Sequence, residues 1–186
     1  NNNLLRIKAI RADFRFLLSL RYIYQYTNQL NIFSLLGNTL GNYEERELLS
    51  IIYKGMYTND LLILEVFRIP EILKNKRNGE LISFGKYTEE SYLSFIMGPI
   101  ENKGFNLTNG HLEFIVNKEN VDINSSIRIH AEYVLDKKVN SRLEGNRIKI
   151  THSTHYNTNE LKSFIRSLGL SLVFDRIDLE NYIGVF

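Results

Sequence analysis

The sequence contains no cysteine, and this absence excludes disulfide bonds, thiol catalysis and cysteine-ligated metals. The same absence fits a reducing compartment, so we expect a cytoplasmic protein. An excess of charge of one sign is also missing, because 23 Lys and Arg residues face 21 Asp and Glu residues, for a formal net charge of +2. No large basic field exists to attract nucleic acid, and we expect no nucleic-acid partner.

Long apolar runs are absent as well. No stretch approaches the 18 uncharged apolar residues that a membrane-spanning helix needs, so we expect no membrane partner. What is present is an ordinary globular mixture, with 44% hydrophobic and 24% charged residues. A chain of 186 residues is long enough for one domain with a small insertion.

The four histidines show no spacing typical of metal ligands. His152 and His155 lie in the strand-like stretch THSTHY, where side chains alternate, so they are expected to point to opposite faces. We therefore predict no metal site. Thr151, Ser153 and His155 share one face, which is either the polar wall of a pocket or the solvent side of a sheet.

The first third of the chain has the pattern of a βαβ unit. Residues 30–36 and 61–67 are short apolar runs bounded by turn residues, and each predicts a strand. Asn42 is predicted to be the N-cap of the helix between them, because a glutamate follows three residues later. A strand, a helix and a strand predict a parallel pair with a right-handed crossover. Continuous apolar runs further predict that both faces of the sheet are covered.

Two stretches follow expected strand ends, where open α/β sheets bind ligands. The loop GNTLGN of residues 37–42 lacks the third glycine of a dinucleotide site and the Lys-Ser/Thr of a phosphate loop, so it is either a structural turn or a ligand-holding turn. Asp13 and Phe14 follow a strand expected over residues 7–12. Either Asp13 forms a hydrogen bond with a ligand and Phe14 stacks on it, or Asp13 only ends the strand and Phe14 packs in the core.

The pattern changes after Pro70. Residues 71–104 are charged and mixed and predict helices, whereas residues 111–156 alternate in the manner of strands with one wet face. A capping signal at residues 157–160, a helical stripe and Gly169 then predict a helix, followed by a pair of antiparallel strands at 170–177 and 182–186. The predicted fold class is α/β, with a sheet domain of residues 1–68 and 156–186 interrupted by an α+β insertion at 69–155.

Four stretches carry a family resemblance: IKAIRADF, FSLLGNTLGNYEERELL, DLLILEV and RIKITHSTHYNTNELKSFIRSLGLSLVFDRID. Together, in this order, they resemble the histidine-specific S-adenosylmethionine-dependent methyltransferases. That family includes the ergothioneine-pathway enzyme that methylates the α-amino group of histidine. The resemblance implies a Rossmann-like methyltransferase sheet, here partial, with an inserted substrate-binding domain and S-adenosylmethionine as cofactor.

The resemblance also implies roles for particular residues. Contacts with the cofactor are implied for Asp13, Phe14 and Gly37. Contacts with the substrate are implied for Asn42, Thr151 and Ser153, and for one of the two tyrosines Tyr87 and Tyr92.

The chain departs from the family at two points. Thr151 stands where the histidine-binding enzyme has a glutamate, and a neutral hydroxyl holds an imidazole N–H less strongly than a carboxylate does. The cofactor's glycine loop and the acid that binds its ribose belong upstream of Asp13 and are absent here. The sequence thus implies the C-terminal part of an N-methyltransferase for an amino acid or small amine, inactive alone.

Without the upstream strands, the strand at residues 30–36 would expose its edge, which an upstream segment or self-association would have to cover. The alternative function is a non-catalytic binding or scaffold protein on a methyltransferase-like fold, since a fold does not determine a function.

Overall fold

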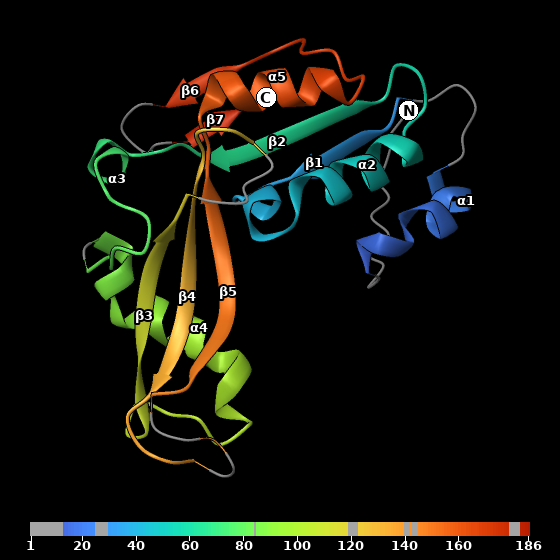
Figure 1. Cartoon of the computed structure of the whole chain (residues 1–186). Coiled ribbons are helices and arrows are strands. Elements are labelled where there is room, and N and C mark those ends of the chain that lie inside the picture. Colours follow the sequence, from blue (N-terminus) through green and yellow to red (C-terminus); the bar gives the residue numbers. More distant parts are fainter. Residues whose placement is uncertain are drawn as a thin grey trace, which may run out of the picture.

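The computed structural model describes residues 13–24, 30–83, 85–118, 123–139, 142, 145–178 and 183–186, without the side chains of Phe14, Ile23 and Tyr24. It shows a mixed α/β architecture with two separate sheets (Figure 1). The strand expected over residues 7–12 lies outside the described residues. The chain enters through a 3-10 helix, η1 (Phe14–Leu20), and one turn of helix, α1 (Arg21–Tyr24).

The first sheet has the strand order β1-β2-β7-β6. Strands β1 (Ile32–Leu35) and β2 (Leu61–Phe67) are parallel, and helix α2 (Glu45–Gly55) connects them. This arrangement confirms the predicted βαβ unit. Strand β7 (Ile183–Val185) pairs antiparallel with β2, and β6 (Arg176–Asp178) pairs antiparallel with β7. The closing antiparallel pair is therefore confirmed, although its first strand begins at residue 176 rather than at 170.

Burial on the first sheet alternates along β1 and β2. Helix α2 and helix α5 (Thr158–Ser167) share one hydrophobic core with Leu64 and Val66, so both helices cover the same face. On β1 and the first half of β2 the other face is open: Ile32 is 59% exposed, and Leu61 and Ile63 are each 37% exposed. The expectation that both faces are covered is wrong here, because the described helices of this sheet pack on one side.

Helix α2 does not begin as the capping rule predicts. Its N-cap is Glu44, whose side chain makes no capping hydrogen bond. Asn42 instead ends a short 3-10 helix, η2 (Thr39–Asn42), so it is not the N-cap of α2. The extra turn of η2 uses the residues that would otherwise have capped the helix. Asn42 is left exposed at the start of the connection to α2.

Helix α5 follows its sequence signal closely. Asn157 is its N-cap and accepts hydrogen bonds from the backbone N–H groups of Asn159 (3.1 Å) and Glu160 (3.4 Å). Gly169 follows the helix with φ 89°, the left-handed conformation predicted for a glycine at this position.

The second sheet is antiparallel, with the strand order β3-β4-β5. Its strands are β3 (Gly110–Asn117), β4 (Ile127–Leu135) and β5 (Arg147–His155). The helical elements before it are α3 (Glu71–Lys74), the 3-10 helix η3 (Gly85–Thr88) and α4 (Glu90–Glu101). Helix α4 lies beside this sheet, as Figure 1 shows.

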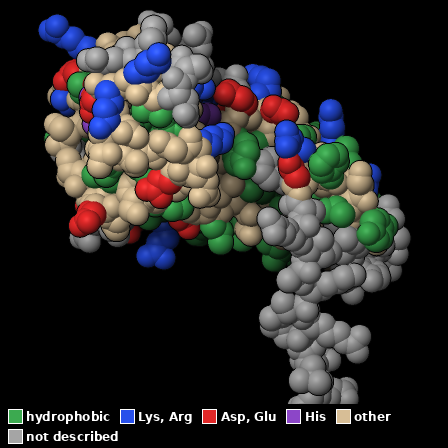
Figure 2. Space-filling view, turned by 90° about the horizontal axis from the view of Figure 1, so that it is seen from below, with side chains coloured by type: hydrophobic (Ala, Val, Ile, Leu, Met, Phe, Trp, Pro, Cys, Tyr) green, Lys and Arg blue, Asp and Glu red, His purple; other side chains and the backbone are tan. Residues whose placement is uncertain are grey.

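The two sheets meet where β2 and β5 end. Arg68 and Tyr156 form an isolated parallel bridge, in which the Tyr156 N–H donates to the Phe67 carbonyl (2.8 Å) and the Ile69 N–H to the Tyr156 carbonyl (3.2 Å). The carboxyl end of β5 is thereby held beside the loop that follows β1. On the face seen in Figure 2, basic and acidic side chains are interspersed, in keeping with the balanced composition.

Candidate functional site

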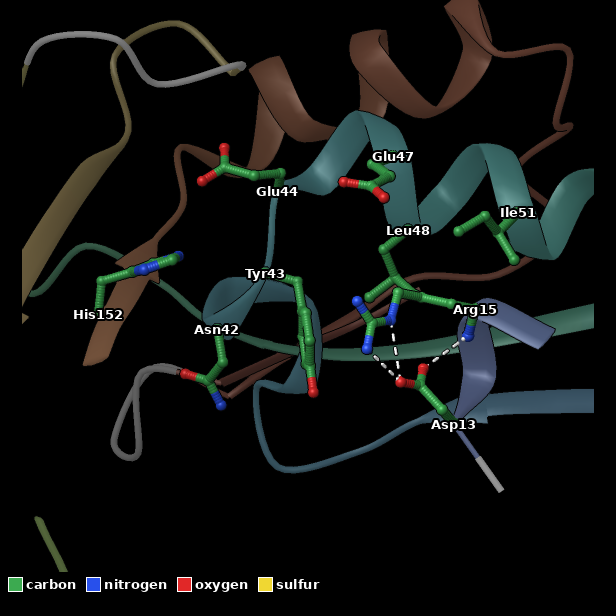
Figure 3. Close-up of a pocket in the computed structure, with 9 residues that line it drawn as sticks. All are labelled: Asp13, Arg15, Asn42, Tyr43, Glu44, Glu47, Leu48, Ile51 and His152. Atoms are coloured by element: carbon green, nitrogen blue, oxygen red, sulfur yellow. Dashed lines mark hydrogen bonds and ion pairs between the residues drawn. The ribbon is translucent and has the colours of Figure 1, made fainter. Parts of the chain in front are cut away.

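A cavity of about 600 Å³ lies at the junction between the first and second sheets (Figure 3). The start of η1, the connection from η2 to α2, the first turns of α2, and β5 each contribute to its wall. The lining residues are Asp13, Arg15, Asn42, Tyr43, Glu44, Glu47, Leu48, Ile51 and His152. Two residues that the resemblance links to cofactor and substrate, Asp13 and Asn42, therefore share one cavity.

Asp13 is tightly engaged with Arg15. The backbone N–H of Arg15 donates to Asp13 Oδ1 (2.9 Å), while Arg15 Nε (2.9 Å) and Nη2 (2.5 Å) both donate to Oδ2. The Arg15 side-chain hydrogen bonds hold the pKa of the Asp13 carboxyl below its usual value. A ligand that binds Asp13 would have to share this carboxylate with Arg15. The side chain of Phe14, the other residue of this motif, lies outside the described residues.

The loop after β1 is organised by Asn38 rather than by Asn42. Asn38 is 1% exposed and has φ 60°, a left-handed conformation that asparagine tolerates better than most residues. Its Nδ2 donates to Ser153 Oγ (3.1 Å) and to the Thr154 carbonyl (3.2 Å), and its Oδ1 accepts from the Phe67 N–H (2.9 Å). Sequence reasoning missed this residue. Its ability to adopt positive φ was readable, but its partners more than a hundred residues away were not.

Gly37 has φ 63° and is not among the residues that line the cavity. Its backbone N–H donates to Glu65 Oε1 (3.2 Å). In this structure its conformation serves the turn into Asn38, and the implied contact of Gly37 with a cofactor stays a prediction.

A buried polar network joins α2 to the second sheet beside the cavity. Arg128 Nη2 donates to Glu45 Oε2 (2.9 Å), and the Arg128 and Glu45 side chains are 7% and 0% exposed. Arg128 Nε donates to Thr154 Oγ1 (3.2 Å), and its Nη1 reaches the carboxylate of Glu44 at 3.3 Å. The Tyr156 hydroxyl donates to Glu45 Oε1 (3.0 Å). Burial, together with the neighbouring Glu45, raises the pKa of the Tyr156 hydroxyl.

His152 contributes the wall from β5. Its Nε2 is buried and has no hydrogen-bond partner among the described residues. Desolvation lowers the pKa of the imidazole, and the nearby Arg128 and Lys149 lower it further. His155 lies on the opposite face of β5, as the alternation predicted. Its ring contacts the Tyr87 hydroxyl (3.2 Å) and the Arg68 carbonyl (3.2 Å), and burial lowers its pKa to about 4.

The residues that the resemblance implies for the substrate do not all meet at this cavity. Thr151 and Ser153 lie on the β5 face opposite His152, and neither lines the cavity. Tyr87 is buried in the core of the second sheet, and Tyr92 packs edge-on against it with ring centroids 5.7 Å apart. Lys86 Nζ lies 4.3 Å from the centroid of the Phe67 ring beside them. The substrate contacts that the resemblance implies for Thr151 and Ser153, and for Tyr87 or Tyr92, stay predictions. They concern the face of β5 opposite His152.

The described residues contain no group of three or more His, Asp and Glu side chains arranged to hold a metal ion. Among the described helices, none combines the length and the apolar character that crossing a membrane requires. A second cavity, of about 800 Å³, lies at the opposite, amino-terminal end of β2, between the end of α2 and the chain after α5.

Comparisons with known proteins give one structural similarity of interest. No protein-family model matches the chain, and no curated protein matches it. Among solved structures, an S-adenosylmethionine-dependent methyltransferase from Clostridium acetobutylicum is similar, with a TM-score of 0.44 and 6% sequence identity. The similarity covers 97% of this chain and 63% of that one. At this score and identity it supports no inference about activity.

Proposed function

We propose that this chain forms part of an S-adenosylmethionine-dependent N-methyltransferase that acts on an amino acid or a small amine. The observation that carries the proposal is the placement of Asp13 and Asn42 in one cavity. The family resemblance implies that Asp13 contacts the cofactor and that Asn42 contacts the amine. The two residues come from separate elements of the chain. Asn42 lies in the connection that follows the parallel strand β1, and the carboxyl ends of such strands are where α/β sheets bind ligands.

The charge of the cavity suits a cationic ligand. Its wall carries three carboxylates, Asp13, Glu44 and Glu47, against the single guanidinium of Arg15. Asp13 is paired with Arg15 and Glu44 with Arg128, whereas Glu47 is exposed and interacts with Arg15 at longer range. A sulfonium and an ammonium ion are both attracted to such a site. The exposed ring of Tyr43 adds an aromatic face for a cation or a purine.

The residues present fit the cationic part of S-adenosylmethionine, and they supply only part of a cofactor site. Residues 1–12 contain no glycine, so a glycine-rich loop is not available before Asp13 in this sequence. We therefore infer that methyl transfer requires a further segment. When bound, the cofactor supplies a methyl group that is already activated by its sulfonium.

The work left to this chain is orientation and electrostatics. Asn42 carries a carboxamide that can accept from an amine N–H and hold the nitrogen in place. The carboxylates Glu44 and Glu47 favour a positive charge in the cavity. Arg128 fixes the start of α2 and with it the position of Glu44. No metal ion and no covalent intermediate are needed for this role.

One observation favours the second candidate function, a non-catalytic binding or scaffold protein. All of the side-chain hydrogen bonds of Asp13 that the structure shows are made with Arg15, which competes with a ligand for the carboxylate. On this reading the cavity would bind ligand weakly, or not at all, and would catalyse nothing.

Calorimetric titration with S-adenosylhomocysteine tests the proposal, on this chain and on the longest natural chain that contains it. We expect binding by the longer chain and a loss of about tenfold in affinity in Asp13→Ala, the value of one charge-assisted hydrogen bond. Asn42→Ala should keep the S-adenosylhomocysteine affinity within about twofold, because Asn42 is assigned to the amine. Asn102→Ala, at the exposed end of α4, is the matched control. The absence of any binding heat with the longer chain refutes the proposed function.

A further inference from the structure

His152 differs from the other three histidines in what its ring contacts. His155 is held by Tyr87 and the Arg68 carbonyl. His111 Nδ1 contacts Asp136 at 2.8 Å, and His130 Nε2 contacts Asn117 at 3.5 Å. His152 alone among these four has a buried ring nitrogen without a hydrogen-bond partner in the described part of the chain.

The ring that carries the unpartnered nitrogen belongs to a residue that lines the cavity. The ring of His152 projects from β5 toward the side where Tyr43 and Glu44 stand, as Figure 3 shows. Both of those neighbours are exposed, Tyr43 by 43% and the Glu44 side chain by 58%. A buried acceptor that has lost water without gaining a partner destabilises the chain, and a ligand donor that reaches it recovers that loss.

The surroundings keep the imidazole neutral and able to accept a proton. Burial lowers its pKa, and two cations act in the same direction: Arg128 on β4 and Lys149 on β5 itself. The ring of His130, its cross-strand partner on β4, lies 6.1 Å away and also has a lowered pKa. Opposing them are Glu44, at the start of α2, and the backbone of Tyr43. The Glu44 carboxylate is thus placed to stabilise an imidazolium once it forms.

We propose that His152 Nε2 accepts the proton that an ammonium ligand must lose in this cavity before its nitrogen can be methylated. The inference rests on the proposed function and names a residue for it. The proton passes from the ammonium nitrogen to Nε2, and the electron pair of the broken N–H bond stays on the nitrogen as its lone pair. The imidazolium then returns the proton to water. The freed lone pair is the nucleophile that methyl transfer requires.

Sinefungin is a suitable probe, because it carries an amine where S-adenosylmethionine carries its sulfonium methyl group, whereas S-adenosylhomocysteine has no group there. We expect the longest natural chain to bind sinefungin about tenfold more tightly than S-adenosylhomocysteine at pH 7.5, the value of one charge-assisted hydrogen bond. The preference should be lost as the pH falls below the ordinary pKa of histidine, about 6.5, since a protonated His152 repels the ammonium group. His152→Ala should reduce the preference to what the carboxylates of the cavity contribute and remove its dependence on the protonation of His152.

His152→Gln separates a role in binding from a role in folding. Glutamine keeps an acceptor oxygen and does not titrate, so this variant should retain a preference for sinefungin that no longer depends on pH. His130→Gln, on the neighbouring strand and outside the cavity wall, is the matched control and should behave as the wild type does.

The experiment distinguishes failure of the proposed function from failure of the role assigned to His152. If neither ligand binds to the longest natural chain, the proposed function is wrong and this inference falls with it. If both ligands bind but the preference for sinefungin is unchanged in His152→Ala, or is independent of pH in the wild type, the proton-accepting role of His152 is refuted while the proposed function stands.

Discussion

Replacing Arg128 with methionine should lower the free energy of unfolding of this protein more than replacing an exposed arginine does. Arg128→Met removes the guanidinium and leaves the Glu45 carboxylate fully buried, with one remaining donor among the described residues, the Tyr156 hydroxyl at 3.0 Å. The hydrogen bond to Thr154 is lost as well. Removing one partner of a buried ion pair costs about 3–5 kcal/mol, because the other charge stays buried without compensation.

Urea denaturation followed by far-UV circular dichroism measures this decrease in the free energy of unfolding. For a chain of this size the same loss lowers the melting temperature by roughly 6–20 °C. Arg147→Met is the matched control. Arg147 contacts Glu113 at 2.6 Å and Glu132 at 3.2 Å, but its side chain is 49% exposed, so its removal should cost no more than about 1 kcal/mol.

The double variant Arg128→Met, Glu45→Gln tests the cause of the loss. Glutamine is neutral and can still accept from the Tyr156 hydroxyl, so the double variant should be more stable than Arg128→Met alone by at least about 1 kcal/mol. If Arg128→Met costs no more than Arg147→Met, or if the two changes at 128 and 45 are simply additive, the buried pair does not hold the two sheets together in the way the structure indicates.

Other predictions concern packing and pH. In Gly41→Ala the new Cβ would lie 2.5 Å from Asn38 Nδ2, so we expect a loss of about 1–3 kcal/mol in urea denaturation. Gly98→Ala, inside α4 with open space around it, should instead stabilise by about 0.5–1 kcal/mol, and equal effects at both sites would contradict the packing shown. His155 has a folded-state pKa of about 4, below its unfolded value near 6.5, so its contribution to stability is complete above pH 6.5 and is lost as the pH falls toward 4. The loss amounts to about 3 kcal/mol, and His155→Gln should remove that part of the pH dependence, whereas identical profiles would refute it.

Local signals in the sequence were enough to predict several elements of the fold. Strand β2 covers the same residues, 61–67, as the apolar run that predicted it. Helix α5 begins after the asparagine that the capping rule selected and is followed by a glycine with φ 89°. In each case the residues that decide the structure are neighbours in the chain. The same holds for the parallel βαβ unit, which needs only two apolar runs and a helix between them.

Asn38 and Asn42 show where such reasoning stops. Both lie in the loop after β1, and the capping rule favoured Asn42 because a glutamate follows it. The structure gives the organising role to Asn38, because the backbone and hydroxyl groups of β5 lie within reach of its side chain. The strand that supplies these groups is 115 residues further along the chain. A short-range pattern cannot specify such a partner, so the choice between two asparagines depends on tertiary structure.

The same limit applies to the candidate site. Asp13 and Asn42 were identified from stretches near the ends of the first sheet's strands. His152 was recognised in the sequence but set aside, because two histidines on opposite strand faces cannot share a metal ion. That argument is correct for metal binding. It did not address a single neutral imidazole whose surroundings, Arg128 and Glu44, come from β4 and from the start of α2.

The position of Arg128 has a consequence for how the cavity is built. Its guanidinium comes from the second sheet, yet the carboxylates that it holds, Glu44 and Glu45, belong to the N-cap and the first residue of α2. Glu44 lines the cavity and Glu45 is buried behind it. A first sheet without the second would therefore keep Asp13 and Asn42 but would leave Glu45 buried without a counter-charge, which a folded chain tolerates poorly. The second sheet thus supports the wall of the cavity through Arg128 and contributes His152 to that wall. Substitutions in the second sheet should therefore alter ligand binding even where the substituted residue touches no ligand.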